Sequence, residues 1–301
     1  KIPMTTSHSH KTGYLFAILA FAIFATQDAI SKHLSDLYPP LMITMIRYWA
    51  FAGFAILITS RGKGGLREGA RTKRPLIQIF RGVLLASQIV VSLLAFRTAG
   101  LLHSQAIFSA TPLLVAMLSV PVLGEAVGWR RWTAIVVGLC GVMIILKPSA
   151  AGIDATLMVP LIAAAMNAVY SVTTRLVSRD DAAITSFFYL GVAGAVVMIV
   201  IGPFYWTNLA PVDWGWIALL CITGISSHFC LIKAYDHLDA VLVQPISYFQ
   251  LVLASFYGVL IFHETLKLNV IVGSLVIVGA GLFTIWREAV RRKQLRLASN
   301  S

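Results

Sequence analysis

Ten apolar stretches restrict this chain to one class of fold. Nine are close to the roughly 20 residues that a helix needs to cross a bilayer core, where backbone groups can hydrogen-bond only within the protein, and the fifth is shorter unless it extends back toward Trp129. Charged residues make up 12% of the sequence, about half the share in a soluble domain. We therefore expect an all-α polytopic membrane protein. The expected spans are Tyr14–Ser31, Leu41–Thr59, Leu76–Ala95, Leu101–Val120, Trp132–Leu146, Leu157–Val177, Ile184–Ile201, Trp214–Ala234, Val241–Phe262 and Leu268–Trp286.

The chain repeats one order of features in its two halves. From Ala95, a polar turn leads into an apolar span that contains a proline, then to a glutamate and a Gly-rich apolar span. The same order returns 139 residues later, where Ala95 falls on Ala234 and Glu125 falls on Glu264. Few residues are identical, so the shared order of features is the evidence for a repeat.

Five spans per half make the second half enter the membrane from the side opposite to the first. We therefore expect two inverted five-helix repeats, residues 14–147 and 154–287, followed by a basic tail over residues 288–301. Secondary transporters use this plan and bind substrate near the midplane, between the two halves. The architecture favours transport over catalysis.

Basic residues are distributed unevenly between the two sides of the membrane. Eighteen of the 24 lysines and arginines lie in segments on the side of the N-terminus, four lie on the other side, and Arg47 and Arg81 lie within spans. Because cytoplasmic segments are enriched in basic residues, both termini are expected in the cytoplasm. The same distribution explains the net charge of +12, so we do not expect nucleic-acid binding.

Two short strings and the repeated pattern resemble a known transporter family. The first span contains FATQDAISKHL (Phe24 to Leu34), and YPP precedes a second span that contains TMIRYW (Thr44 to Trp49). Over residues 14–288 the chain resembles the drug/metabolite transporter superfamily, in particular its EamA-type ten-helix exporters, and the strings look like those of the YddG-like aromatic amino-acid exporters. The resemblance implies export of amino acids, aromatic and other apolar ones favoured, and of related metabolites across a bacterial inner membrane by alternating access.

Polar side chains at membrane depth indicate a cavity shared by the halves. A polar group there is costly, so it usually faces protein or a water-filled space. Single serines and threonines are better explained by hydrogen bonds between helices. Larger polar side chains, however, recur on the same few spans. The expected substrate-binding residues are Gln27, Gln88, His103, Asn167, Tyr170, His228, Tyr248 and Gln250.

Charged residues within spans allow two interpretations. Asp28 either pairs with Lys32 one helical turn later or meets a substrate ammonium or a proton. Arg47 either binds a substrate carboxylate or, as we favour, fixes neighbouring helices through backbone carbonyls. Arg81 is expected to extend to the lipid headgroups. Recognition should then depend mainly on neutral hydrogen-bonding groups, with an aromatic wall around Tyr248.

Two glutamates and a set of glycines have structural interpretations. Glu125 and Glu264 follow the fourth and ninth spans, where capping or pairing with nearby basic residues is expected. The proline of the ninth span, Pro245, lies near its start, a departure from the family habit of a mid-helix proline. Small residues let helices approach closely, so the glycines of the last span in each half predict a scaffold, with a homodimer face as an alternative. These glycines are Gly138, Gly141, Gly273, Gly279 and Gly281.

Other classes of function lack their motifs. The chain has no Gly-x-x-x-x-Gly-Lys loop, so no nucleotide or other cofactor is expected. The three cysteines form no C-x-x-C pair, and the first apolar span is too long for a removable signal peptide. An intramembrane enzyme would need a nucleophile and base, or metal ligands, at membrane depth, and His263-Glu264 lacks the second histidine of a zinc motif. The alternative within transport is a broader metabolite or drug exporter.

Overall fold

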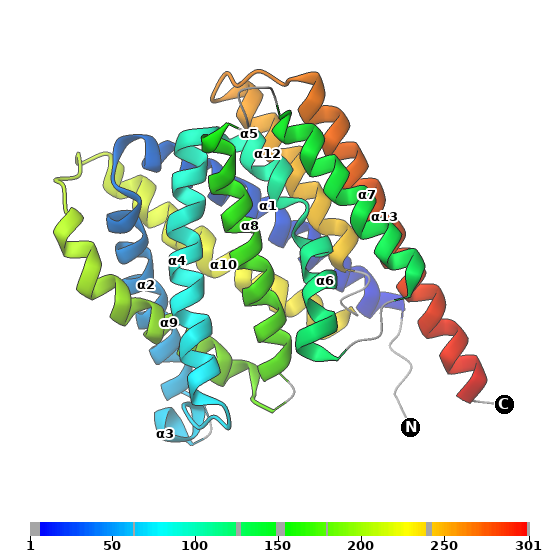
Figure 1. The fold of residues 1–301 in the computed structure, drawn as a ribbon. Coiled ribbons are helices and arrows are strands. Elements are labelled where there is room, and N and C mark those ends of the chain that lie inside the picture. The colour runs from blue at the N-terminus through cyan, green and yellow to red at the C-terminus, as the bar shows by residue number, and fades with distance from the viewer. Residues whose placement is uncertain are drawn as a thin grey trace.

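The computed structural model describes residues 7–62, 64–124, 128–148, 154–178, 180–238 and 243–299. In this part of the chain, the regular secondary structure consists of α-helices and two short 3-10 turns, and the long helices lie side by side in one bundle (Figure 1). Nine helices among these residues are long and apolar enough to cross a membrane, and Tyr248–Leu260 is a shorter apolar helix. The prediction of an all-helical, multi-pass membrane protein is confirmed.

The helices follow the two halves of the sequence. The first half consists of α1 (Ser7–Leu37), α2 (Pro40–Ser60), α3 (Gly65–Gly69), α4 (Pro75–Ala99), α5 (Leu101–Phe108), α6 (Thr111–Leu123) and α7 (Trp129–Leu146). The second half consists of α8 (Ala155–Val177), α9 (Ala183–Ile201), η1 (Gly202–Tyr205), α10 (Asp213–His237), η2 (Gln244–Ser247), α12 (Tyr248–Leu260) and α13 (Leu268–Ser299). Because α13 continues to Ser299, the basic segment expected as a tail extends the last helix.

The fourth and ninth spans are not single straight helices. In the first half the chain breaks after Phe108, and α6 begins at Thr111 with Pro112 in its first turn, where a proline needs no hydrogen-bond partner. In the second half η2 ends at Ser247, which lies 139 residues after Phe108, and α12 follows. The two breaks therefore fall at the same place in the repeat, although the prolines do not.

Each long helix of one half packs against a helix of the other half. The third membrane-spanning helix of each half lies against the first one of the other half: α4 packs on α8, and α10 packs on α1. In addition, α2 packs on α9 and α7 packs on α13. The core is thus mainly an interface between the halves. Polar side chains on the contacting faces of α1, α4, α8 and α10 consequently lie at that interface.

The α7–α13 contact depends on glycine. A Cβ atom built at Gly141 would lie 2.8 Å from the Gly273 carbonyl oxygen, and one at Gly273 would lie 2.6 Å from the Gly141 carbonyl oxygen. Backbones this close leave no room for a side chain, so the expected scaffold between these spans is confirmed. Gly279 differs, since a Cβ there would meet no atom within 4 Å.

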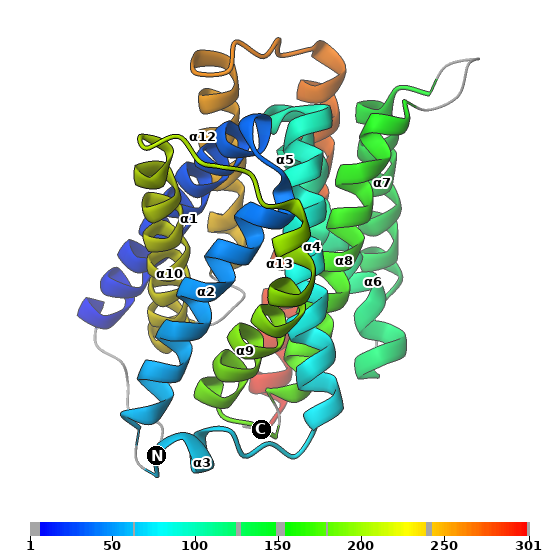
Figure 2. The ribbon, with the colours of Figure 1, turned by 90° about the vertical axis from the view of Figure 1, so that its left-hand side faces the viewer.

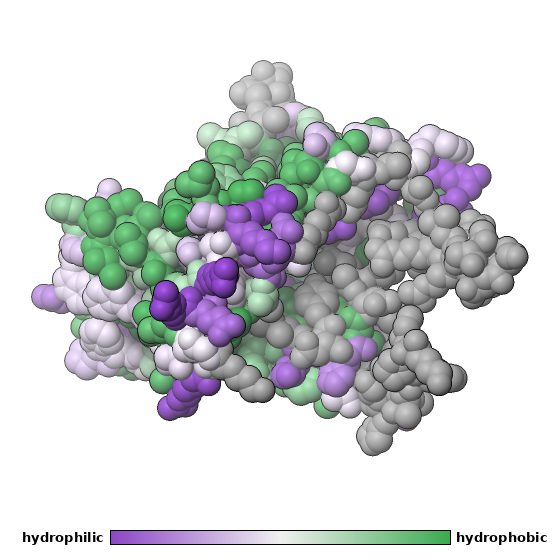
Figure 3. Space-filling model, turned by 90° about the horizontal axis from the view of Figure 1, so that it is seen from below, coloured by the Kyte–Doolittle hydropathy of each residue, from purple (hydrophilic) through white to green (hydrophobic). Residues whose placement is uncertain are grey.

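The helix α3 and the C-terminal end of α13 lie at the same end of the bundle, which we call the α3 end (Figure 2). Hydrophilic residues form patches on this end, beside strongly hydrophobic ones (Figure 3). The segment between α2 and α4, which lies here, contains six of the chain's basic residues.

Candidate functional site

Asp28 lies at the centre of a polar cluster that both halves build. The side-chain amides of Gln105 on α5 and Gln250 on α12 donate to the same carboxylate oxygen, Oδ2, at 2.6 and 2.7 Å. Gln105 belongs to the first half and Gln250 to the second. Among the residues that the structure describes, none donates to Oδ1, so one face of this carboxylate keeps its acceptor capacity.

The neighbouring side chain, Gln27, faces α10 and Arg47. Ser227 donates to Gln27 Oε1 at 3.5 Å, the upper limit for a hydrogen bond. A Cβ atom built at Gly224 would lie 3.3 Å from Gln27 Oε1 and 3.8 Å from Arg47 Nη2, so both groups converge on this glycine. Arg47 and Asp28 attract each other electrostatically. The cluster thus contains one anion and one cation with three amides around them.

Aromatic rings border the cluster on the α10 side. The His228 ring lies 5.2 Å from the Phe24 ring, edge to face, and 6.3 Å from the Phe51 ring at an interplanar angle of 25°. Asp28, Arg47 and His228 are partly exposed, whereas Gln27 and Gln105 are buried. The charged groups and the His228 ring thus keep some accessible surface although they lie within apolar helices.

Other predicted site residues lie elsewhere. Gln88 on α4 donates to Ser92 of its own helix at 2.8 Å. Tyr170 on α8 lies under the Arg81 guanidinium, 5.6 Å away. Tyr248 is buried, and its hydroxyl occupies the space where Gly281 of α13 lacks a side chain.

Two further members of the predicted set also fall outside the Asp28 cluster. His103 lies at the first turn of α5, in the electrostatic field of Lys267 and Glu264. Asn167 is partly exposed on α8, and among the described residues its side chain makes no hydrogen bond. The structure thus joins Gln27, His228 and Gln250 with both charged candidates, Asp28 and Arg47.

One expectation for a charged side chain was wrong, and one of the two alternatives for Asp28 is excluded. Lys32 pairs with Asp36 at 2.6 Å, not with Asp28. Arg81 does not extend to headgroups: it is 2% exposed and donates to Gln78 on its own helix and, at 3.0 Å, to Thr174 on α8. Within the described residues, the Arg47 side chain makes no hydrogen bond to a backbone carbonyl. Both roles considered for Arg47 therefore stay predictions.

The two glutamates can be compared with their expected roles. Glu264 caps α5, accepting from the backbone N–H groups of Leu101 and Leu102 at 2.7 and 2.8 Å. This confirms capping, at the N-terminus of a helix of the other half, where a carboxylate is favourable. Gly100, at φ 84°, leaves room for that carboxylate. Glu125 lies outside the described residues.

Sequence reasoning missed several members of the cluster. Gln105 is a polar residue at the start of the fourth span, but nothing in the sequence places it against Asp28, 77 residues away. Phe24 and Phe51 are indistinguishable in sequence from ordinary packing residues. The sequence showed only an amide side chain near the start of an apolar span. This observation did not distinguish Gln105 from the other polar residues of the spans.

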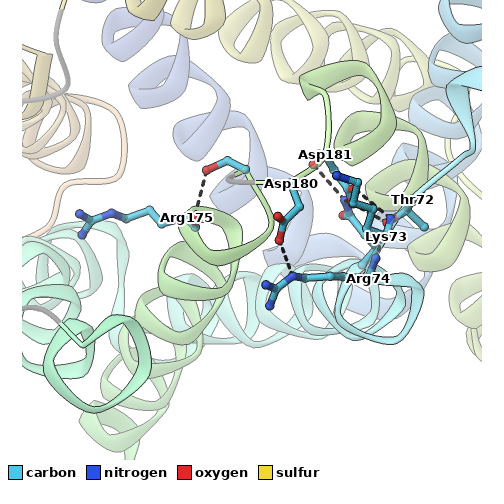
Figure 4. Close-up of polar contacts among 9 residues, drawn as sticks. Thr72, Lys73, Arg74, Arg175, Asp180 and Asp181 are labelled. Carbon is cyan, nitrogen blue, oxygen red and sulfur yellow. Dashed lines mark hydrogen bonds and ion pairs between the residues drawn. The ribbon is translucent and has the colours of Figure 1, made fainter.

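At the α3 end, two aspartates after α8 hold the segment before α4, a contact we call the loop latch. Asp181 accepts from the hydroxyl of Thr72, the backbone N–H of Lys73 at 3.0 Å and the amide of Gln78 at 2.8 Å. Arg74 Nε donates to Asp180 at 2.6 Å (Figure 4). The loop latch therefore ties the first half to the second.

At the opposite end, Tyr38 joins the equivalent segments, a contact we call the tyrosine latch. The Tyr38 hydroxyl donates to Asp213 at 2.6 Å and accepts from the backbone N–H of Ala210 at 3.0 Å. Asp213 lies 139 residues after Arg74, so the two latches connect corresponding parts of the repeat. They differ in chemistry, since the loop latch contains an ion pair and the tyrosine latch a phenol on a carboxylate.

Hydrogen bonding sets the acidity of the loop latch. Burial raises the pKa of Asp181, but donation from Thr72, Lys73 and Gln78 outweighs it, and the pKa lies below the ordinary value of 3.8. The carboxylate is consequently ionised throughout the physiological range. In the tyrosine latch, the hydrogen bond to Asp213 raises the pKa of Tyr38.

Comparison with known proteins decides the class. The model of the EamA-like transporter family matches residues 11–147 and again residues 155–286. The chain belongs to this family. It is a transporter rather than an enzyme, and two copies of one family unit make up its halves.

Relatives of known function carry different cargo. The chain is 25% identical to an S-adenosylmethionine uptake transporter of Rickettsia prowazekii over 93% of this chain and 94% of the relative. It is 26% identical to a riboflavin transporter of Vibrio cholerae (98% and 100% covered) and to a pseudopaline exporter of Pseudomonas aeruginosa (90% and 94%). These relatives support a carrier of small metabolites, without singling out aromatic amino-acid exporters.

A solved crystal structure shares the fold. It matches with a TM-score of 0.59 and 20% sequence identity, covering 96% of this chain and 99% of its own. At this identity the match concerns the fold alone. It spans both halves of the bundle.

Proposed function

We propose that this EamA-family protein is a secondary transporter of small zwitterionic metabolites, with aromatic and other apolar amino acids foremost, and that it exports them across a bacterial inner membrane. The Asp28 cluster is the observation that supports this proposal. It combines an anion, a cation and neutral amides at an interface between the halves, where inverted-repeat transporters bind substrate.

This proposal replaces the recognition by neutral groups that we expected from the sequence, because two charged groups lie in the cluster and suit the two poles of an amino acid. Asp28 Oδ1 accepts the substrate ammonium while Oδ2 stays bound to the glutamines. Arg47 supplies a guanidinium, which binds a carboxylate through two parallel hydrogen bonds. Each substrate charge then meets a partner, which matters because an unpaired charge is expensive in a low-dielectric space.

The neutral groups and rings set the preference for the side chain. Phe24, Phe51 and His228 form an aromatic wall beside the charged pair. Apolar contacts discriminate only modestly between side chains, so broad selectivity follows. The neutral residues Gln88, His103, Asn167, Tyr170 and Tyr248 are proposed to contact substrate in other conformations of the cycle.

The latches would alternate during transport. Opening toward the α3 end requires release of Asp180 and Asp181, and opening toward the opposite end requires release of Tyr38 from Asp213. The α3 end is proposed to face the cytoplasm, on the grounds of its basic segments. Substrate would then enter past the loop latch and leave past the tyrosine latch.

A broader metabolite carrier is the second candidate, and the named relatives favour it. S-adenosylmethionine, riboflavin and pseudopaline are the cargo named for them. The relatives include an uptake transporter and an exporter, so the direction of transport here is itself part of the proposal.

Uptake by proteoliposomes that contain the purified full-length chain tests the proposal. The substrates are radiolabelled phenylalanine, leucine, glutamate, S-adenosylmethionine and riboflavin, each with and without a pH gradient. We expect saturable uptake of phenylalanine and leucine, and little of glutamate, whose extra carboxylate has no partner in the site. Uptake of S-adenosylmethionine or riboflavin alone would establish the second candidate instead.

A further inference from the structure

A groove opens between α7 and α13, away from the Asp28 cluster. Its volume is about 420 Å³, and its lining is almost entirely apolar. Small residues make the floor: Ala134 and Ala280 are buried, and a Cβ atom at Gly279 would meet no atom within 4 Å. Val137 and Phe283, both more than a third exposed, form the walls. The missing side chain of Gly279 is therefore what leaves the groove open.

The position of the groove identifies its surroundings as lipid. The helices α7 and α13 lie side by side at one edge of the bundle (Figure 1). The lining residues belong to the spans Trp129–Leu146 and Leu268–Arg287, so the groove runs along the membrane-spanning part of the surface. An apolar groove in this position faces the acyl chains of the lipid and not water.

One end of the groove is basic and aromatic. Trp129 and Arg130 line it, with the Arg130 guanidinium 5.4 Å from the Trp129 ring centroid. Arg287 follows Phe283 by four residues, one turn further along the same side of α13, and lies 5.8 Å from the Trp286 ring. In the part of the chain that the structure describes, no carboxylate forms an ion pair with Arg130.

We propose that this groove binds a phospholipid with an anionic headgroup, one acyl chain lying over Gly279 and the phosphate against Arg130. Charge complementarity selects this occupant, because basic pockets between transmembrane helices bind anionic headgroups. Tryptophans at the same end suit the headgroup level of the bilayer. A two-fold symmetric dimer through this face would instead bring the same basic and aromatic residues of a second copy to this end.

Two substitutions test the acyl-chain contact and the headgroup contact separately. Gly279→Leu fills the groove without a clash, and Gly53→Leu is its control, since Gly53 is an exposed helical glycine that also has no atom within 4 Å of a Cβ. Arg130→Gln removes the charge at the headgroup, and Arg97→Gln, an exposed arginine outside the groove, is its control.

Native mass spectrometry of the delipidated full-length protein, titrated with dioleoyl phosphatidylglycerol or dioleoyl phosphatidylcholine, measures the binding. We expect one tightly held phosphatidylglycerol on the wild type and both controls. Arg130→Gln should bind it about fivefold more weakly, given about 1 kcal/mol for each basic residue near a headgroup. Gly279→Leu should also bind it more weakly, because its side chain occupies the place of the acyl chain.

The proposal fails if phosphatidylcholine binds equally well, or if each variant matches its control. It also fails if the wild type is a dimer that Gly279→Leu dissociates without loss of bound lipid, since the groove would then be a protein interface. The measurement is independent of what the protein transports.

Discussion

At the scale of single residues, the position of Asp28 is set by distant parts of the chain. Lys32 lies four residues from both Asp28 and Asp36, so helical spacing alone allows either pair. In the structure Lys32 pairs with Asp36. The Asp28 carboxylate instead accepts hydrogen bonds from Gln105 and Gln250, which lie 77 and 222 residues later in the sequence. Polar residues within spans were visible in the sequence, but their partners depend on packing between the halves.

The histidine beside Phe24 and Phe51 gives a test of the aromatic wall. We expect His228→Ala to weaken transport of phenylalanine a few-fold more than transport of leucine, since aromatic contacts contribute about 0.5–1.5 kcal/mol beyond burial. Competition between the two substrates in proteoliposomes measures the ratio. An equal loss for both would show that His228 supports the fold or the charged pair instead.

At the scale of elements, glycine contacts determine how closely α7 and α13 approach. We expect Gly141→Val to lower the melting temperature clearly, because its side chain would meet the Gly273 backbone, and overpacking costs about 1–3 kcal/mol even where side chains can adjust. Gly53→Val is the matched control. Comparable melting temperatures for the two variants would contradict the close contact.

The loop latch should keep the α3 end closed. We expect Asp181→Ala to raise the thiol reactivity of a cysteine at Thr185, a residue that is 3% exposed, in a protein without other cysteines. The rise should be at least about fivefold, as three donors lose a charged acceptor. Asp180→Asn breaks only an ion pair with a half-exposed Arg74 and should change reactivity little. Equal effects of both variants would contradict the special role of Asp181.

The pH dependence of the latch follows from the same hydrogen bonds. The pKa of Asp181 is lower in the latched protein than its ordinary 3.8, so the stabilisation is fully present above 3.8 and is lost only as the pH falls through the lowered value. Thr185 cysteine reactivity should therefore stay constant between about pH 5 and 8. A step within that range would show that another group titrates with the latch.

At the scale of the whole molecule, the basic segments predict the orientation. A cysteine at position 97 should react with a membrane-impermeant reagent added to intact cells, and a cysteine at position 67 should not. Both arginines are exposed in the fold, so burial does not protect either site. Labelling at position 67 alone would reverse the topology and, with it, the direction assigned to the two latches.

The architecture was predictable because lipid leaves few solutions: long apolar spans must be helices, and a repeated order of features implies repeated halves. The break after Phe108 and its counterpart at Ser247 were less visible, since Pro245 does not occupy the position of Pro112. The Asp28 cluster was only partly predictable. Its members come from five helices. The pattern of apolar residues in the sequence does not show which of these helices contact one another through their polar side chains.

Counterflow of phenylalanine in proteoliposomes measures whether substrate binds at Asp28 between the halves. Asp28→Asn keeps the size of the side chain but removes the charge for the ammonium, and Asp36→Asn is the control on the same helix. We predict that Asp36→Asn exchanges phenylalanine at nearly the wild-type rate, whereas Asp28→Asn loses at least about tenfold, as expected for a charged hydrogen bond. Equal exchange by the two variants, with wild-type folding, would show that the substrate ammonium does not bind Asp28.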